Sequence, residues 1–323
     1  MTTTAQHTAT IREGTQAANV GPSLREYSRT DRTISCLCGG RRLHKAAIQK
    51  SNHLLSIVTV SYNSQKTITR TIDSIAAQTY PHIEHIVIDG GSTDGTVEIL
   101  RSRQTEIDLW ISERDQGISD AFNKGISLAR GEFIALVNSD DWLNADHMER
   151  AVAALSESDS DFVFGDLMVH APDGSPQHVF TGEANYARRI RNAMPGIHHP
   201  SVVCRRTVYE RYGLYRTDLR IAMDYEWLLR CHLAGVRGTY TPDITSHMDG
   251  GGISNKAGRQ SLAEVREISR LYGYPTSLAW IRFVARITRL RARLLIEQRI
   301  STGMASQVRS LINSRYRSAG TSN

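Results

Sequence analysis

Two acidic side chains follow directly after an apolar segment in the first half of the chain. Asp140 and Asp141 come straight after residues 133–137, within the sequence NSDDW. Two adjacent carboxylates at the end of a buried strand are costly unless something positive binds there. Carboxylate oxygens are hard ligands that suit Mg²⁺ or Mn²⁺ held together with phosphates. The pair therefore favours a divalent metal site, and the alternative is that one aspartate caps the next helix.

Polar residues also end two earlier apolar runs. Tyr62 and Asn63 end the first run, and Asp89 ends the second, just before GGSTDGT. An aromatic face at a strand end can lie against a base or sugar, and a carboxylate can accept hydrogen bonds from a base or ribose. The alternatives are a packing tyrosine and a glycine-rich turn in which Ser92 or Asp94 caps the next helix. Both readings of the second site are compatible, because the cap and Asp89 are different residues.

A third acidic position opens a helical segment in the second half of the chain. Asp224 begins the sequence DYEWLLR, with Glu226 two residues on and Arg230 six residues on. Side chains two apart on a helix point in different directions, so one carboxylate can take a proton from a substrate while the other packs or pairs with Arg230. The alternative is that Asp224 only caps the helix.

Alternating strand and helix patterns position these residues. The apolar runs are short, rich in β-branched residues and followed by polar breaks, as expected of parallel strands buried on both faces. The breaks then lie at the carboxyl ends of the strands, the edge of an open α/β sheet where ligands bind. The predicted strands are 55–61, 83–88, 107–112, 132–137 and a pair within 161–169, and the predicted helices are 65–77, 94–103, 118–129, 144–156 and 224–234.

The two ends of the chain differ from its centre in charge. Residues 1–52, 53–255 and 256–323 carry net charges of +5, −9 and +10, within a total of +6. We expect 1–52 to be a disordered basic tail, 53–255 to fold as one domain, and 256–323 to be a basic helical extension. Basic tails beside an acidic domain favour contact with an anionic surface.

One stretch of the extension combines arginines with apolar residues at helical spacing. Residues 280–298 place four arginines on one side and aromatic and aliphatic residues on another: Arg282, Arg286, Arg289 and Arg293 against Trp280, Phe283, Ile287 and Leu294. Such a helix either packs on the parent domain or lies at a membrane interface. No run reaches the roughly 20 apolar residues of a membrane span, and no apolar signal-peptide centre is present, so the cytoplasm is the expected compartment. The four cysteines are too few and scattered for a disulfide framework.

The motifs, taken in order, resemble family 2 glycosyltransferases with the GT-A fold, and among them bacterial enzymes of exopolysaccharide or colanic-acid type. The resemblance rests on SIVTVSYN, VIDGGSTDGT, DQGISDAFNKG and NSDDW, and continues through HHPSVV, MDYEWLLR and HMDGGGIS. It implies a Rossmann-like, mostly parallel sheet with flanking helices. It also implies that Tyr62 and Asp89 contact the base, that Asp140 and Asp141 bind ribose and metal, and that Asp224 is the catalytic base.

Two departures from the family pattern leave alternatives open. Asn138 stands where the first acid of the metal motif is usual, so either Asp140 or Asp141 is the direct ligand. The third motif has Ala121-Phe122-Asn123 where Ala-Arg-Asn is frequent, so the diphosphate relies on Lys124, or Lys124 is a solvated helix lysine. Asp115 and Asp120 flank this motif and can orient Lys124 or touch the donor sugar.

Histidines complete the expected site. His198 and His199 precede a β-rich run and are expected, with Glu226 and Arg230, on the acceptor side. His247 stands near the glycines 250–252, and by analogy with GT-A enzymes it contacts the metal; the alternative is a bond to backbone.

The resemblance implies an inverting transferase that moves a sugar from a UDP-, GDP- or dTDP-sugar to a glycan or lipid-linked acceptor, with Mn²⁺ or Mg²⁺. The alternatives are a non-catalytic nucleotide- or glycan-binding protein on the same fold, and a nucleotidyltransferase. A nucleotidyltransferase would be expected to show a basic, glycine-rich triphosphate loop at the first strand end, and SYNSQKT is not one. No pattern typical of nucleic-acid binding is found in the sequence.

Overall fold

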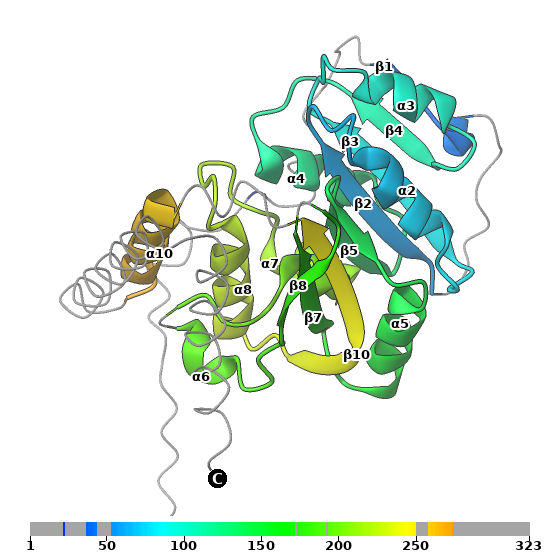
Figure 1. The fold of residues 1–323 in the computed structure, drawn as a ribbon. Coiled ribbons are helices and arrows are strands. Elements are labelled where there is room, and N and C mark those ends of the chain that lie inside the picture. Colours follow the sequence, from blue (N-terminus) through cyan, green and yellow to red (C-terminus); the bar gives the residue numbers. More distant parts are fainter. Residues whose placement is uncertain are drawn as a thin grey trace, which may run out of the picture. The chain divides into compact units, whose positions relative to one another are not determined.

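The computed structural model describes residue 22 and residues 37–43, 53–171, 173–191, 193–249 and 258–273. Its internal contacts divide the chain into two units, Met1–Lys256 and Ala257–Asn323. Every strand of the described residues belongs to the first unit, while the described part of the second unit contains helix α10 (Gly258–Leu271) (Figure 1). No helix among the described residues is both long and apolar enough to cross a membrane.

Four parallel strands form the half of the sheet that the sequence predicted. They are β2 (Leu55–Ser61), β3 (Ile83–Asp89), β4 (Leu109–Ser112) and β5 (Phe133–Asn138). The order β4-β3-β2-β5 places β2 between β3 and β5, so the strand order reverses beside β2. All residues of β2 are buried, which confirms the prediction of a strand covered on both faces. The register pairs Ser61 with Asp89 and Val60 with Asn138, and so brings the polar strand ends together.

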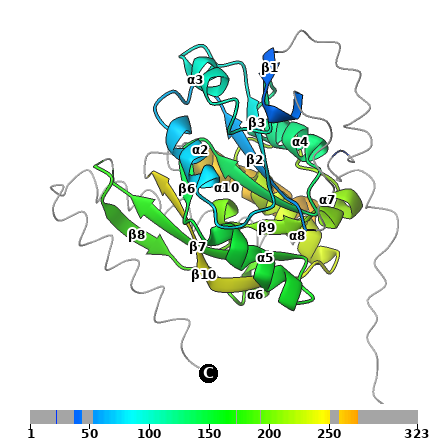
Figure 2. The same ribbon diagram turned by 90° about the vertical axis from the view of Figure 1, so that its right-hand side faces the viewer.

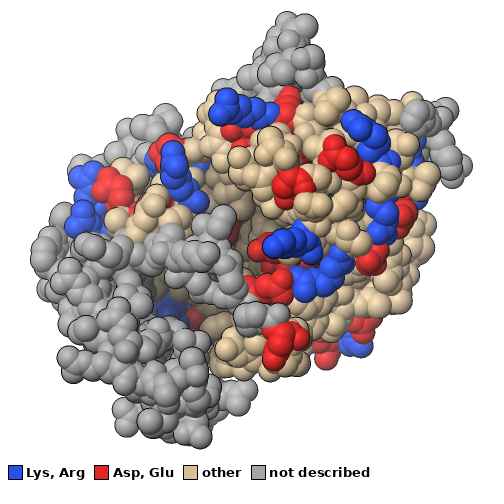
Figure 3. Space-filling view, turned by 45° about the horizontal axis from the view of Figure 1, so that its top comes forward, with Lys and Arg blue, Asp and Glu red and all other residues tan. Residues whose placement is uncertain are grey.

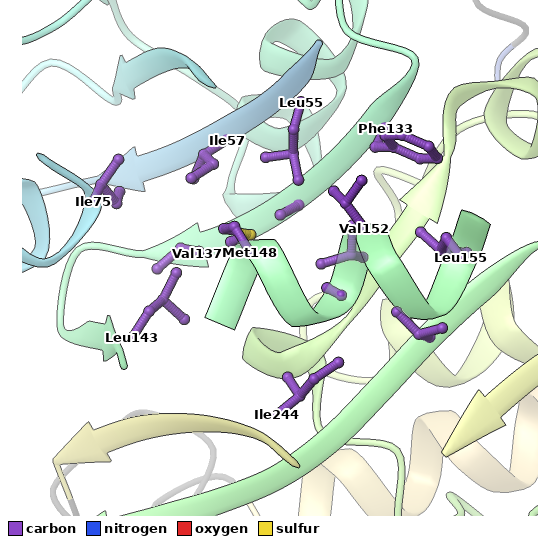
Figure 4. Packing of buried hydrophobic residues seen from close by; sticks show 14 residues of the cluster. Leu55, Ile57, Ile75, Phe133, Val137, Leu143, Met148, Val152, Leu155 and Ile244 are labelled. Atoms are coloured by element: carbon purple, nitrogen blue, oxygen red, sulfur yellow. The ribbon is translucent and has the colours of Figure 1, made fainter. Parts of the chain in front are cut away.

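Helices cover both faces of these strands. They are α2 (Ile68–Ala76), α3 (Thr96–Ser102), α4 (Ile118–Leu128) and α5 (His147–Glu157). Side chains of α2 and α3 pack with Val87, and side chains of α5 pack with Ile57 and Phe133, as Figure 4 shows for α5. The opposite face receives α4, where a Cβ at Gly125 would lie only 2.1 Å from Val58 Cγ1. A glycine is therefore required for α4 to approach β2 this closely.

The second half of the first unit extends the same sheet. Its strands are β6 (Asp141–Leu143), β7 (Phe162–His170), β8 (Pro176–Phe180), β9 (Val203–Arg205) and β10 (Gly238–Asp249). They continue the order as β5-β9-β7-β10-β6, with β8 paired to β7. The sequence predicted a strand pair within 161–169, which was wrong, because that range is the single strand β7 and its partner β8 follows the turn; the other strands were not predicted. The long strand β10 runs parallel to β7 and antiparallel to β6, so His247 lies opposite Trp142 and Met248 opposite Asp141. Non-local pairing thus brings the end of β10 to the acidic motif.

Further helices lie beside this extension (Figure 2). They are α6 (Ala187–Ile190), the 3₁₀ turn η2 (His199–Ser201), α7 (Arg206–Tyr212) and α8 (Met223–Leu233). The ring of Tyr209 stacks on that of Trp227, with centroids 4.8 Å apart, and Tyr215 packs beside both. This aromatic group anchors α8 to α7, and with it the residues at the start of α8.

Part of the N-terminal segment departs from the prediction of a disordered tail. Residues 37–43 form strand β1 (Leu37–Gly39), which pairs antiparallel with β4, and the 3₁₀ turn η1 (Arg41–Leu43). Arg41 pairs with Asp108, and Arg42 pairs with Glu84, whose side chain is fully buried. The prediction was wrong for these residues because a sheet edge and two acids far along the chain hold them. Residues 250–252 and 280–298 lie outside the described residues, so the expectations for them stay predictions.

Candidate active site

The carboxylate of Asp89 organises the loop that follows β3. Its two oxygens accept hydrogen bonds from Ser61 Oγ (2.9 Å), Ser112 Oγ (2.7 Å), Gly91 N (3.2 Å) and Ser92 N (2.9 Å), and Ser92 Oγ also donates to it. The residue is fully buried. These donors fill the roughly four lone-pair sites of a carboxylate. In this structure Asp89 therefore shapes the loop, and contact with a nucleoside base would require a hydroxyl to turn away.

The end of β2 is joined to the same loop. Asn63 has a positive φ of 50°, its Oδ1 accepts from Thr93 N (2.9 Å), and its own N–H donates to Ser92 Oγ (2.7 Å). Asparagine is one of the few side chains that tolerate this backbone region. Tyr62, beside it, is 65% exposed, which makes it an exposed large aromatic at this edge of the sheet. The structure thus presents a free tyrosine face next to a fixed loop.

The acidic motif after β5 is buried and electrostatically strained. Asp141 is 2% exposed and accepts a hydrogen bond from Asn138 Nδ2 (2.9 Å). Burial raises the pKa of Asp141 well above its usual range, and the neighbouring Asp140 and Asp249 raise it further. Burial and Asp249 likewise raise the pKa of Asp140. These carboxylates destabilise one another's charged forms, and a cation among them would offset that repulsion.

Arg70 and Asp249 belong to this motif, and sequence reasoning missed both. The Arg70 guanidinium pairs with Asp249 Oδ2 (2.6 Å), donates to the Asp140 carbonyl oxygen (3.1 Å), and lies 3.6 Å from the ring centroid of Trp142. The two residues are 179 positions apart, and Arg70 reads in sequence as an ordinary polar position of α2. Only the pairing of β10 with β6 brings them together, so no local signal could have found them.

The oxygen atoms of this motif suit a divalent cation, although the described residues contain no group of three or more His, Cys, Asp or Glu side chains placed to hold one. Asn138 Oδ1 is buried without a hydrogen-bond partner among the described residues, beside the mutually repelling carboxylates of Asp140 and Asp141. Amide and carboxylate oxygens are the donor set that Mg²⁺ and Mn²⁺ prefer. The chemistry of the residues therefore fits such an ion.

His247 does not present a free nitrogen to a metal. Its Nδ1 lies 3.0 Å from His170 Nε2, its Nε2 lies 2.8 Å from Asn144 Oδ1, and its ring stacks on Trp142. Burial, then His170 and Arg70, lower the pKa of His247 to about 4. The predicted metal contact would require one of these hydrogen bonds to break. In this structure His247 packs and bonds within the β6, β7 and β10 group.

Lys124 lies in a buried ionic network on α4, which differs from both sequence readings. Its Nζ contacts Glu113 Oε1 (2.8 Å), Asp120 Oδ2 (3.4 Å) and the Arg114 carbonyl oxygen (3.3 Å), and the residue is 5% exposed. An ammonium group has three N–H donors, and three oxygens lie around it. The network fixes α4 against the loop after β4, with Asp120 orienting Lys124 as one alternative expected. Lys124 is thus neither solvated nor free to bind a diphosphate.

The start of α8 brings Asp224 to His199. Asp224 Oδ1 lies 4.0 Å from His199 Nε2, and neither atom has a hydrogen-bond partner among the described residues. Burial raises the pKa of Asp224, and His199 opposes that shift. Ala222 is the N-cap of α8, so the alternative that Asp224 serves as the cap was wrong. His198, next in the chain, packs its ring near Phe180, with centroids 5.8 Å apart.

Glu226 and Arg230, which the sequence placed on the acceptor side, pair with each other and so do not offer free groups to an acceptor. Glu226 is fully buried, and both of its oxygens pair with Arg230 at 3.0 Å. Arg230 also donates to the carbonyl oxygens of Tyr212 and Leu214. The correction follows from burial: this pair ties α8 to the loop after α7. The prediction that one of the two acids pairs with Arg230 is confirmed.

Comparison with known proteins identifies the family. The profile of the glycosyl transferase family 2 matches residues 56–215, the segment that holds the polar edge of β2, β3 and β5. This chain belongs to the family 2 glycosyltransferases. A glycosyltransferase of PGL/p-HBAD biosynthesis from Mycobacterium tuberculosis is 29% identical over 209 residues, which cover 62% of this chain and 79% of that protein. The putative teichuronic acid biosynthesis glycosyltransferase TuaG of Bacillus subtilis is 34% identical over 130 residues, covering 39% and 52%.

Solved structures show that this glycosyltransferase has the GT-A fold. Staphylococcus aureus TarS 1–349 in complex with UDP-GlcNAc aligns with a TM-score of 0.54 and 19% identity, covering 73% of this chain and 72% of that one. The mannosyltransferase PcManGT of Pyrobaculum calidifontis, in complex with GDP-Man and Mn²⁺, aligns with a TM-score of 0.52 and 18% identity, covering 84% of each chain. At such identities the likeness establishes the mixed α/β architecture alone.

Proposed function

We propose that this glycosyltransferase moves a sugar from a nucleoside diphosphate sugar to a hydroxyl of a glycan or lipid-linked saccharide, with inversion at the anomeric carbon. The observation that carries the proposal is Asp224 Oδ1, a buried oxygen 4.0 Å from His199 Nε2 with no hydrogen-bond partner among the described residues of this GT-A protein. A buried charge without a partner is costly, and such groups mark functional sites. The complexes of TarS with UDP-GlcNAc and of PcManGT with GDP-Man support a nucleotide-sugar donor.

The donor binds at the carboxyl ends of β2, β3 and β5. Tyr62 offers its exposed ring to the base, and the loop held by Asn63 and Asp89 offers backbone to the ribose and diphosphate. Asp140 and Asp141, with Asn138 beside them, would hold Mn²⁺ or Mg²⁺, which as a Lewis acid supplies charge stabilisation to the leaving diphosphate. The complex of PcManGT with Mn²⁺ supports this choice of ion.

Asp224 takes the proton of the attacking hydroxyl. Its raised pKa makes it a stronger base than an exposed aspartate, which is suited to accepting a proton near neutral pH. The hydroxyl oxygen bonds to the anomeric carbon as the bond to the diphosphate breaks, and the nucleoside diphosphate leaves. A single base with in-line attack produces inversion. Arg230 neutralises Glu226, so Asp224 is the carboxylate of this segment that is free to act.

A screen of nucleotide sugars tests the proposal. Purified full-length chain is incubated with UDP-, GDP- and dTDP-sugars in Mn²⁺, and release of nucleoside diphosphate by slow hydrolysis is measured. We expect one class of nucleotide sugar to be hydrolysed and EDTA to suppress this hydrolysis. We expect Asp224→Asn to bind the same nucleoside diphosphate but not to hydrolyse the nucleotide sugar. Binding without release in the wild type would instead support the non-catalytic binding protein. Release of pyrophosphate from a nucleoside triphosphate would support the nucleotidyltransferase.

We further propose a cytoplasmic enzyme that associates peripherally with anionic membrane through residues 280–298, for the synthesis of a surface polysaccharide. The support is the arginine-rich helical spacing of that segment, which anionic lipid attracts by about 1 kcal/mol per residue near the surface. On the face in Figure 3, basic and acidic side chains are interspersed among the coloured residues. Full-length protein should sediment with anionic vesicles at low salt. A variant with Arg282, Arg286, Arg289 and Arg293 changed to Gln should stay in solution, and equal sedimentation would contradict the proposal.

A further inference from the structure

Two buried polar atoms face each other across a gap at the start of α8. Asp224 Oδ1 and His199 Nε2 lie 4.0 Å apart, beyond the 3.5 Å limit of a hydrogen bond, and both are without a partner in the described part of the chain. Leaving a buried donor or acceptor unpaired costs about 1–3 kcal/mol per group. Native structures keep few such groups, and each calls for an explanation. Two of them only 4.0 Å apart point to a group that bridges them in the working enzyme.

The surrounding structure holds the two side chains apart. The turn that carries His199 is fixed by Ser201 Oγ, which donates to the His198 carbonyl oxygen (2.7 Å) and accepts from Gly165 N (3.0 Å). The His199 ring packs against Phe122 of α4, with centroids 5.0 Å apart. On the other side, α8 is anchored because Trp227 Nε1 donates to the Gly213 carbonyl oxygen (3.1 Å). The gap is therefore a feature of the packing.

By its distance, this separation can be bridged by a single oxygen atom. An atom about 2.8 Å from each of two points that are 4.0 Å apart makes a normal hydrogen bond to both. The carboxylate of Asp224 accepts only, so the bound group must donate to it. His199 Nε2–H can donate, so the same group must also accept. A hydroxyl is the group that donates and accepts through one atom.

We propose that His199 is a second catalytic residue, whose Nε2–H holds the oxygen of the attacking acceptor hydroxyl while Asp224 Oδ1 holds its proton. The inference rests on the proposed function and specifies its acceptor. In the reaction the O–H bond breaks and its proton passes to Asp224, while the oxygen forms the glycosidic bond and the diphosphate departs with its electron pair. The bond from His199 positions a lone pair of that oxygen, and positioning of this kind lowers the barrier.

The same geometry selects the chemical class of the acceptor. A phosphate acceptor would bring negative charge against the Asp224 carboxylate, which is unfavourable at this distance. An ammonium group has no lone pair to accept from His199 Nε2–H. A neutral alcohol, such as a sugar hydroxyl, satisfies both contacts. The chain therefore acts after a reaction that has already supplied a hydroxyl-bearing saccharide or lipid alcohol, and does not load a sugar onto a bare lipid phosphate.

Donor hydrolysis tests the inference, because water then occupies the position of the hydroxyl. The probe is the nucleotide sugar that the wild type hydrolyses fastest in Mn²⁺. We expect His199→Leu to lower the turnover number by about 10–100-fold with unchanged affinity for the nucleoside diphosphate. His199→Gln should keep most of the rate, since its amide N–H can replace Nε2–H, and the shorter His199→Asn should not. His232→Gln, on the last turn of the same helix α8, is the matched control and should match the wild type.

A double variant separates a shared role from independent ones. If both residues act on one oxygen, Asp224→Asn with His199→Leu should be no slower than Asp224→Asn alone, as groups that work as a unit are strongly non-additive. A wild-type rate in His199→Leu, or equal loss in the Leu and Gln variants, would overturn the inference and assign His199 to packing. If His199→Leu does not fold, the comparison of Gln with Asn decides the question. A wild type that hydrolyses no donor overturns the proposed function itself, which is a distinguishable outcome.

Discussion

The two sides of the candidate active site, the proposed donor side and the proposed acceptor side, differ in how their polar groups are satisfied. On the donor side, at the ends of β2 and β3, Asp89 accepts hydrogen bonds from four residues and Asn63 bonds to the facing loop. On the acceptor side, at the start of α8, Asp224 Oδ1 and His199 Nε2 have no hydrogen-bond partner among the residues the structure describes. The two unpartnered atoms, like the Asp89 carboxylate, are themselves buried, although the Asp224 and His199 side chains as a whole are partly exposed.

The contrast indicates which side is preorganised in the absence of its ligand. A satisfied network is rigid and keeps its shape in the absence of a ligand, because every donor already has its acceptor. Unpaired buried atoms cost stability until a ligand pairs them, and natural proteins keep such strain mainly at functional sites. We infer that the donor side is a scaffold for binding, while the acceptor side holds groups for the reaction. The metal motif is intermediate, because Asp141 has a partner in Asn138, while Asn138 Oδ1 has none among the described residues.

The largest effect is expected from removing the base on the acceptor side. Asp224→Asn keeps the shape of the side chain and removes proton acceptance, so turnover should fall by roughly 10²–10⁴ while nucleotide affinity stays near that of the wild type. Steady-state hydrolysis and isothermal titration with the nucleoside diphosphate measure the two quantities. Glu226→Gln is the matched comparison, and its loss should appear in stability, since it leaves Arg230 buried without a counter-charge. If Asp224→Asn turns over as fast as the wild type, Asp224 is not the catalytic base, and the two sides do not differ in the way proposed.

The donor side should respond in the opposite way. Asp89→Asn turns an N–H group towards hydroxyl and amide donors, so the free energy of unfolding should fall by about 2–3 kcal/mol. Urea unfolding followed by circular dichroism measures this loss. Ser112→Ala removes one of the donors and should cost about 1 kcal/mol. If Asp89→Asn is as stable as the wild type but binds no nucleotide, the Asp89 carboxylate binds the ligand and does not stabilise the loop.

The metal motif is expected to give a smaller effect that depends on the ion. Asp140→Ala or Asp141→Ala should weaken binding of the nucleoside diphosphate in Mn²⁺ by about tenfold or more, the consequence of losing one charged ligand, and should change metal-free binding little. Titration with and without Mn²⁺ measures the difference. Asp243→Ala removes an exposed acid from the same strand, β10, as Asp249 and is the control. Equal affinity in both acidic variants and the wild type would contradict the metal assignment.

Local sequence pattern predicted the first half of the fold closely. Strand β2 has the bounds that were expected, and β3, β4, β5 and helix α4 differ by a residue or two at their ends. These elements are short, apolar and β-branched, or strongly periodic, so their neighbours along the chain suffice to specify them. Strand β10 carries mostly polar and half-buried residues and becomes a strand through pairing with β7 and β6. The sequence of such a strand has no local hydrophobic period from which it could be predicted.

The candidate site divides in the same way. The residues at strand ends were found because motif and element adjoin in sequence, as for Asp89 and Asp141. The partnerships were not found: Lys124 with Glu113, Arg70 with Asp249, and Asp224 with His199 join residues from different elements. Sequence can name a residue capable of chemistry. Whether it is saturated or free depends on the tertiary packing around it.

The smallest effect is expected in the stability of Asp224→Asn and its dependence on pH. It tests whether burial of the Asp224 charge destabilises the folded protein. Burial raises the pKa of Asp224 in the folded state above its unfolded value, so the folded protein is penalised when this group is charged. Asp224→Asn should therefore raise the free energy of unfolding at neutral pH, because it removes a charge that burial disfavours. Thermal melting or urea unfolding of both proteins between pH 4 and pH 7 measures this gain.

The sign of the pH dependence makes the test specific. The pKa of Asp224 is higher in the folded state than in the unfolded state. As the pH falls towards the ordinary range of an aspartate, the folded protein therefore takes up this proton first, and the cost of burying the charged carboxylate disappears. The stability gain of Asp224→Asn should shrink over that interval, and the turnover of the wild type should fall together with it, since the protonated acid cannot accept the hydroxyl proton. Glu226→Gln should show no such gain, because Arg230 already pairs with that carboxylate. A variant Asp224→Asn that is less stable than the wild type at pH 7 would mean that the carboxylate is satisfied in solution, and the contrast between the two sides would fail.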